Sequence, residues 1–189
     1  EGEDLRRGGI ASSHRPWAEW ERADLPGTGL GQPDLSWANV SGAKLRGARV
    51  IGANLDMADL TGADLQGAII INTKLNSTSL SRAVCGVTII ANCDLTRVIV
   101  LDNVRHAGPS MISLDTLARS KGQVSARFLE GAGVPPLLVA AQDAFRESGM
   151  TSTRVLLLGS ENDDEFAVKV KAGLSEAQVP SWIIAADDE

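Results

Sequence analysis

Residues 38–80 read ANVSG AKLRG ARVIG ANLDM ADLTG ADLQG AIIIN TKLNS TSL, and they decide the fold. A large apolar residue returns at every fifth position, and a small residue stands two places before it. This register extends without an insertion from Leu25 to Val100. The predicted core includes central and small positions of the repeat: Leu45, Val50, Leu55, Leu60, Leu65, Ile70, Leu75, Leu80, Ala53, Ala58 and Ala63.

A period of five residues fits neither a helix nor an ordinary strand. On an α-helix each fifth residue is displaced by about 140°, so the Leu set would spiral around the surface. On a strand an odd spacing alternates between the two faces. The pattern therefore predicts a chain that turns a corner once per repeat, with four corners closing a square coil. Stacked coils bury the apolar face that one repeat cannot bury alone, and the small residue prevents overfilling of the core.

The motif resembles the signature A-(D/N)-L-x-x of the pentapeptide-repeat family, as at Ala53-Asn54-Leu55, Ala58-Asp59-Leu60 and Ala63-Asp64-Leu65. The resemblance covers roughly residues 18–103 and implies a right-handed quadrilateral β-helix. Sixteen repeats would make about four coils. At the strand spacing of about 4.8 Å per coil, the rod would be roughly 20 Å long.

The charge distribution argues against direct nucleic-acid binding. The net charge is −6. Residues 17–104 carry seven basic and nine acidic side chains, and residues 105–189 carry eight basic and twelve acidic ones. Binding through phosphates needs a basic face. No apolar run approaches 18 residues, so a membrane span is not expected.

The two cysteines, Cys85 and Cys93, occupy inward positions of the repeat and are predicted to be free and buried. Two isolated cysteines favour a reducing, cytoplasmic compartment. The chain starts EGEDLRRGG, without Met or a signal-peptide core, so we expect the numbering to begin inside a longer chain or after a tag. Residues 1–16 are predicted to be a leader or N-terminal cap.

Three tryptophans lie in or beside the repeats. Trp17 and Trp20 are interpreted as a cap over the open end of the core, because terminal repeats of a solenoid are atypical. Trp37 falls at an outward position and is the candidate contact for a partner.

Acidic and amide side chains precede many of the central residues. They are predicted to bond backbone groups at the corners rather than to be catalytic. The set is Asp34, Asn39, Asn54, Asp59, Asp64 and Asp94.

The repeat predicts a β-helix over residues 17–104, followed by a helical connector and cap over 105–150. Helices are expected over 112–119, 126–130 and 137–147, each beginning near Ser or Pro and ending near Gly. Residues 151–189 read as strand, helix and strand, a partial βαβ unit with parallel strands. The predicted fold class is mainly β, with this α/β unit after the capped β-helix.

Residues 106–135, HAGPSMISLDTLARSKGQVSARFLEGAGVP, resemble the segment that joins pentapeptide repeats to a bacterial Toll/interleukin-1 receptor (TIR) domain. The following residues are similar to a TIR opening, although the first strand ends Leu158-Gly159-Ser160 rather than in a pattern resembling F-I-S-Y-S. Many bacterial TIR domains hydrolyse NAD with a glutamate on a later helix. The chain ends at Glu189 before that helix, so no acid here inherits the role.

Three functions are compatible with the sequence. The first is a non-catalytic scaffold for protein interaction or self-association, homodimers included, within a bacterial TIR-type signalling or defence protein. The second is DNA mimicry directed at gyrase or topoisomerase, which needs a long acidic face that this rod lacks. The third is a fragment of a NAD-hydrolysing effector. The sequence contains no Ser/His/Asp set, metal-ligand spacing or phosphate loop, so no enzyme activity, cofactor or metal is predicted for this chain.

Overall fold

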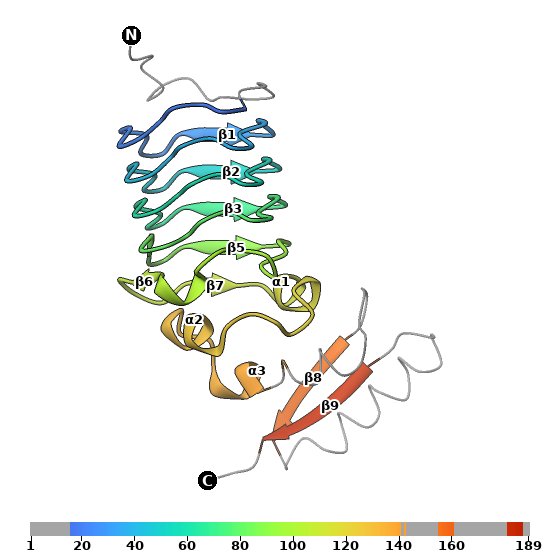
Figure 1. The fold of residues 1–189 in the computed structure, drawn as a ribbon. Coiled ribbons are helices and arrows are strands. Elements are labelled where there is room, and N and C mark those ends of the chain that lie inside the picture. Colours follow the sequence, from blue (N-terminus) through green and yellow to red (C-terminus); the bar gives the residue numbers. More distant parts are fainter. Residues whose placement is uncertain (1–15, 141, 143–154, 161–180, 187–189) are drawn as a thin grey trace.

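The computed structural model describes residues 16–140, 142, 155–160 and 181–186. Its larger part is a right-handed quadrilateral β-helix of about four coils, stacked like a rod (Figure 1). The fold class predicted from the five-residue period is therefore confirmed. The first fifteen residues, predicted as most of a leader or N-terminal cap, lie outside the described part.

The strands are short and the helices follow them in the chain. The elements are β1 (Gly29–Gly31), β2 (Arg49–Ile51), β3 (Ile69–Ile71), β4 (Val84–Cys85), β5 (Ile89–Ala91), the 3₁₀ helix η1 (Leu101–Asn103), β6 (Arg105–His106), β7 (Met111–Ile112), α1 (Leu114–Arg119), α2 (Ala126–Gly131), α3 (Pro136–Ala140), β8 (Val155–Ser160) and β9 (Ser181–Ala186).

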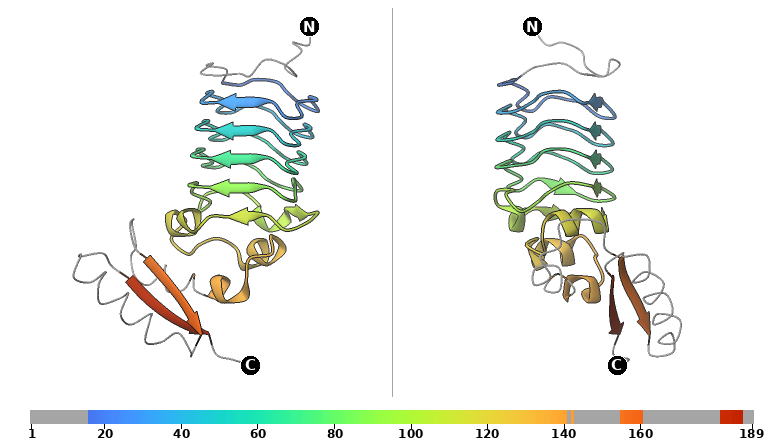
Figure 2. Two further views of the ribbon diagram at one scale, coloured as in Figure 1. Left: turned by 180° about the vertical axis from the view of Figure 1, so that it is seen from behind. Right: turned by 90° about the vertical axis from the view of Figure 1, so that its right-hand side faces the viewer.

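One side of the rod is a parallel sheet in the order β1-β2-β3-β5-β7, which faces the viewer in the left panel of Figure 2. Leu30 pairs with Val50, and Val50 pairs with Ile70, so the register advances by twenty residues per coil. Four pentapeptides thus close one coil.

Each corner places one residue in the left-handed region. From Trp17 to Asn92, every residue two places after a central position has a positive φ, between 53° and 69°. Six of these sixteen residues are glycines and ten are not. Ala58 N–H donates to the Leu55 carbonyl across one such corner at 3.0 Å, which is the hydrogen bond of a β-turn whose third residue is left-handed. The corner at every fifth residue is therefore a backbone feature that side chains other than glycine also adopt.

The predicted Asx residues have the backbone role expected of them. Asp59 Oδ1 accepts a hydrogen bond from Thr61 N–H at 2.8 Å, at the corner that follows. The same contact to the residue two places later is made by all six: Asp34, Asn39, Asn54, Asp59, Asp64 and Asp94. These side chains therefore stabilise the corners.

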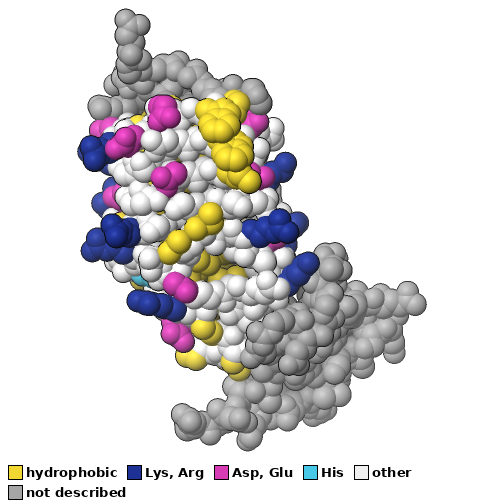
Figure 3. Space-filling model, in the orientation of Figure 1, with side chains coloured by type: hydrophobic (Ala, Val, Ile, Leu, Met, Phe, Trp, Pro, Cys, Tyr) yellow, Lys and Arg dark blue, Asp and Glu magenta, His cyan; other side chains and the backbone are white. Residues whose placement is uncertain are grey.

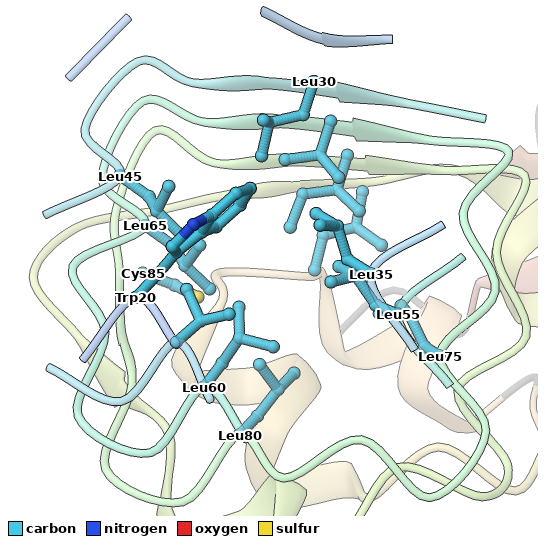
Figure 4. Close-up of a pocket in the computed structure, with 14 residues that line it drawn as sticks. Trp20, Leu30, Leu35, Leu45, Leu55, Leu60, Leu65, Leu75, Leu80 and Cys85 are labelled. Atoms are coloured by element: carbon cyan, nitrogen blue, oxygen red, sulfur yellow. The ribbon is translucent and has the colours of Figure 1, made fainter. Parts of the chain in front are cut away.

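The rod has a buried, largely aliphatic core. All eleven residues of the predicted core are at most 4% exposed, and central side chains of successive coils stack along the axis (Figure 4). Three threonines at small positions of the repeat donate side-chain hydrogen bonds to backbone carbonyls of the preceding coil. The hydroxyl groups of Thr73, Thr78 and Thr88 donate to carbonyls 23 residues earlier, at 3.1, 2.7 and 2.9 Å. These three buried hydroxyl groups are thereby satisfied, whereas the buried hydroxyl of Thr28 in the first described coil has no partner among the described residues.

The uninterrupted register ends at Leu95, not at Val100 as the sequence suggested. Val100 is 43% exposed and left-handed, with φ of 57°, and the next residue, Leu101, is buried instead. The pairing of Val84 with Arg105 advances by 21 residues, and that of Ile89 with Met111 by 22. Inserted residues before β6 and β7 thus shift the pairing register of the ladder. The sequence does not reveal this shift, because Val100 is apolar and therefore fits a central position of the repeat.

The ladder continues beyond residue 104 through β6 and β7 before the helices begin. Helix α1 starts at Leu114 rather than 112, because Met111–Ile112 pairs with β5. Ser113 and Ser125 cap α1 and α2, accepting hydrogen bonds from Thr116 N–H and Phe128 N–H. Buried Leu117, Phe128 and Leu129 join the core cluster of the β-helix. The two helices therefore close its C-terminal end.

The last described segments are β8 and β9, which pair in parallel from Val155↔Ser181 to Ser160↔Ala186. The predicted parallel strands are confirmed, whereas the helix expected between them lies outside the described residues, as do most of residues 141–150. Within the described part, no helix has the length and apolar character needed to cross a membrane.

Candidate functional site

Two exposed tryptophans stack on one corner of the rod. The rings of Trp17 and Trp37 lie with centroids 4.9 Å apart and an interplanar angle of 13°. Trp17 is 65% exposed and Trp37 is 48% exposed. The sequence singled out Trp37 as an outward contact, and the structure places it beside a second aromatic ring.

The corner column continues below the stacked rings. Met57 follows Trp37 by one coil, is 46% exposed and has the same left-handed backbone. Polar Ser77 occupies the next coil, so the apolar column ends there. Figure 3 shows exposed hydrophobic side chains gathered on one edge of the N-terminal coils. We call Trp17, Trp37 and Met57 the aromatic corner.

Trp17 and Trp20 have different positions, although both were interpreted as a cap. Trp20 packs against the core cluster and its ring lies at the N-terminal end of the core, among the central leucines (Figure 4). Trp17 points outward instead, because it stands at a corner position, three residues earlier. The cap interpretation is therefore wrong for Trp17.

Residues 17–104 carry charges of both signs in similar numbers, seven basic and nine acidic. Lys44, Arg46 and Arg49 are exposed, and Arg46 Nη1 lies 3.4 Å from Asp64 Oδ2. Exposed pairs of this kind contribute up to about 1 kcal/mol. No group of three or more potential ligands for a metal ion occurs among the residues that the structure describes.

The buried thiols are poor nucleophiles. Burial raises the pKa of Cys85 to about 11, and burial likewise raises the pKa of Cys93. Both cysteines are free, as predicted. Because the thiolate is the reactive form, neither has the environment of a catalytic cysteine. Burial also lowers the pKa of His106, whose ring packs on Phe128 with centroids 5.2 Å apart.

The repeats match a known sequence family. Residues 34–70, 43–82 and 58–99 match the family described as pentapeptide repeats, with eight copies of the repeat. The repeat segment belongs to the pentapeptide-repeat family. The matched residues of this pentapeptide-repeat rod end at 99, so the resemblance of residues 106–189 to a TIR protein stays a prediction. No curated protein matches the chain.

Several solved pentapeptide-repeat structures are similar to this chain. The Rfr23 protein of the cyanobacterium Cyanothece 51142 aligns with a TM-score of 0.53 and 19% identity, over 57% of this chain and 85% of that one. HetL, involved in heterocyst differentiation regulation in Nostoc sp. strain PCC 7120, aligns with a TM-score of 0.46 and 26% identity, over 48% of this chain and 44% of its own. The present chain thus spans less than half of HetL.

A third similar structure is a pentapeptide repeat protein from the Arabidopsis thaliana thylakoid lumen, with a TM-score of 0.46 and 28% identity over 53% of this chain and 74% of that one. The likeness to Rfr23 supports the β-helix fold alone, so the site has to be argued from this chain's own surface.

Trp17 and Met57 are members of this surface that the sequence did not single out. The signal was present, because 17, 37 and 57 differ by the twenty residues of one coil. This spacing becomes meaningful only when four pentapeptides are known to close a coil and Trp17 is known to occupy a corner position.

Proposed function

We propose that this pentapeptide-repeat rod is a non-catalytic scaffold that binds a protein partner through the aromatic corner. The observation that carries the proposal is the exposed stack of Trp17 on Trp37. Tryptophan is enriched among the residues that dominate binding energies at protein interfaces. Its large ring offers contact area at a small cost in conformational entropy.

The setting of the corner supports this role. Each Trp is held by a backbone that hydrogen-bonds to the next coil: Trp17 N–H donates to Ser36 O and Trp37 N–H donates to Asp56 O, both at 3.0 Å. Because these hydrogen bonds hold the backbone of both coils, binding a partner here costs little backbone conformational entropy. Met57 adds an adaptable apolar contact beside the rings.

We further propose that the rod is the scaffold of a bacterial TIR-type signalling or defence protein located in the cytoplasm. The connector motif in residues 106–135 and the parallel pairing of β8 with β9 support the TIR assignment. The free cysteines support a reducing compartment. The third hypothesis, that the chain is a fragment of a NAD-hydrolysing effector, differs from the scaffold hypothesis only in the residues that a longer parent chain would contain.

DNA mimicry is disfavoured by the charges. A mimic presents a long acidic face, whereas residues 17–104 have only two acidic residues in excess, nine against seven. The similarity to QnrB1, a plasmid-mediated fluoroquinolone resistance protein, has a TM-score of 0.37 at 15% identity and carries no argument. We expect the chain to leave DNA supercoiling by gyrase unchanged, and salt-sensitive inhibition of that reaction would reverse this conclusion.

The scaffold proposal is tested by comparing the wild-type chain with the double variant Trp17→Ser, Trp37→Ser. Both chains are immobilised and exposed to host extract, and retained proteins are quantified; sedimentation equilibrium of the same chains reports self-association. Val87→Ser is the matched control, because Val87 is a corner residue that is 74% exposed and lies outside the aromatic corner.

We expect a protein, or a second copy of the chain, to be bound by the wild type and the control and lost by the double variant. Each protein identified is then purified and titrated, and its Kd should weaken at least tenfold in the double variant. Equal binding by all three chains, or no binding by the wild type, would contradict the role of the aromatic corner.

A further inference from the structure

A polar cleft lies where the last coil meets the helical cap. Its volume is about 480 Å³, within the range of small-molecule sites. Its lining residues are Arg82, Asp102, Asn103, Val104, Arg105, His106, Arg127 and Gly131.

Three arginines reach this cleft from separate parts of the fold. Arg82 stands at a corner two residues before β4, Arg105 begins β6, which pairs with β4, and Arg127 lies in α2. All three are exposed, and in the described part of the chain none of them has a side-chain hydrogen bond or ion pair. Figure 3 shows Lys and Arg side chains near the histidine towards the C-terminal end of the rod.

The walls of the cleft are held together closely. His106, the second residue of β6, packs against Phe128 of α2, and a Cβ on Gly131 would come within 2.4 Å of His106 Cδ2. Only glycine permits this approach of α2 to β6. The spacing between Arg105 and Arg127 is therefore set by packing rather than by a flexible loop.

The charge of the lining indicates the ligand. Three arginines and Asp102 leave two positive charges, which matches a phosphoryl group carrying about two negative charges at neutral pH. Guanidinium groups present forked N–H donors suited to phosphate oxygens. Three guanidinium groups lining one cleft can together offer N–H donors to the several oxygens of a tetrahedral oxyanion, whereas a carboxylate has only two oxygens to accept them.

We propose that this cleft binds a phosphoryl dianion, either inorganic phosphate or the phosphate group of a small ester. The proposal does not depend on the aromatic corner, which lies on the N-terminal coils. It gives the rod a second site, at which a small ligand would join the last coil to α2.

The test is an NMR titration of the whole chain, at constant ionic strength, with inorganic phosphate, glycerol 3-phosphate and acetate in turn. Saturable shifts at residues around β6 and α2 are expected with both phosphates, and acetate should bind at least tenfold more weakly. An ester that binds at least as tightly as phosphate identifies a phosphoester ligand; a weaker ester identifies free phosphate.

Charge variants locate the site. The triple variant Arg82→Gln, Arg105→Gln, Arg127→Gln should weaken phosphate binding by about fiftyfold or more, and Asp102→Asn should strengthen it by about threefold. The triple variant Lys44→Gln, Arg46→Gln, Arg49→Gln has the same net charge and leaves the cleft intact, so it should bind within about twofold of the wild type. Circular dichroism confirms that each variant is folded.

No saturable shift in the wild type up to about 20 mM phosphate, a concentration well above a Kd of 1 mM, would overturn the proposal. Equal weakening by the two triple variants would also overturn it, because it would show a diffuse charge effect.

Discussion

Replacing one central leucine tests how the stacked core stabilises the rod. Leu60 is 3% exposed, and its equivalents one coil away are Val40 and Leu80. Leu60→Ala removes three carbons from this column, at about 0.8 kcal/mol each, or about 2.4 kcal/mol. The neighbouring coils are fixed by backbone bonds and close the space only partly, so the remaining cavity raises the cost to about 3–4 kcal/mol.

The assay is urea unfolding followed by far-ultraviolet circular dichroism, with the m-value checked for constancy. Lys44→Ala is the control, because Lys44 is exposed in the preceding coil and should change the free energy of unfolding by less than about 0.5 kcal/mol. Leu25→Ala, in the first described coil, should cost less than Leu60→Ala, because a terminal coil has a neighbour on one side only and can open locally. A loss below about 1 kcal/mol at Leu60 would refute the stacked core.

Three further predictions address the corners, the cap and the thiols. Val87→Asn should stabilise the chain by up to about 1 kcal/mol in urea unfolding, because Val87 has φ of 55° and is 74% exposed, and asparagine tolerates the left-handed region better than a β-branched residue; a destabilised variant would show that Val87 is held by an unrecognised contact. Gly131→Ala should cost about 1–3 kcal/mol, since its Cβ would meet His106 Cδ2 at 2.4 Å, and the added change His106→Ala should recover part of that loss; if a double-mutant cycle shows no coupling, the close approach does not matter. Burial raises the pKa of the Cys85 thiol from its ordinary value of 9.0 to about 11, so its contribution to stability is present below pH 9 and is lost as the pH rises towards 11. Native thiols should therefore react with a disulfide reagent at pH 8 at least about a hundredfold more slowly than in denaturant, and equal rates would show that the thiols are accessible.

The sequence predicts the coil well because the repeat is redundant. Central residues such as Leu55 and Leu65 recur so often that one deviation does not obscure the period, and each Asx side chain confirms a corner locally. The register shift after Leu95 was not predictable, because Val98 and Val100 satisfy the apolar pattern while the backbone places Leu101 inside. Local residue type does not reveal an insertion when the inserted residue is also apolar.

The candidate sites depend on residues that are distant in the sequence. Trp17 and Trp37 become neighbours only through the twenty-residue coil. The three cleft arginines could not be grouped from the sequence at all, because the inserted residues shift Arg105 out of the simple register and α2 is placed by the packing of His106 on Phe128. Knowledge of the coil length recovers the first site, whereas the second needs the structure.

The central claim is that a corner at every fifth residue, and four per coil, organises this chain. It is tested most directly by the free energy of unfolding of a chain in which residues 43–62 are duplicated, compared with a chain that carries one alanine inserted after Gly62. Duplication adds a whole coil and reproduces the natural junction of glycine and alanine, so we predict a folded rod, longer by about 4.8 Å and at least as stable as the wild type. The single insertion should destabilise the chain by several kcal/mol, because it displaces the following leucines from the core. Comparable stability of the one-residue insertion, or unfolding of the duplicated chain, would contradict the account.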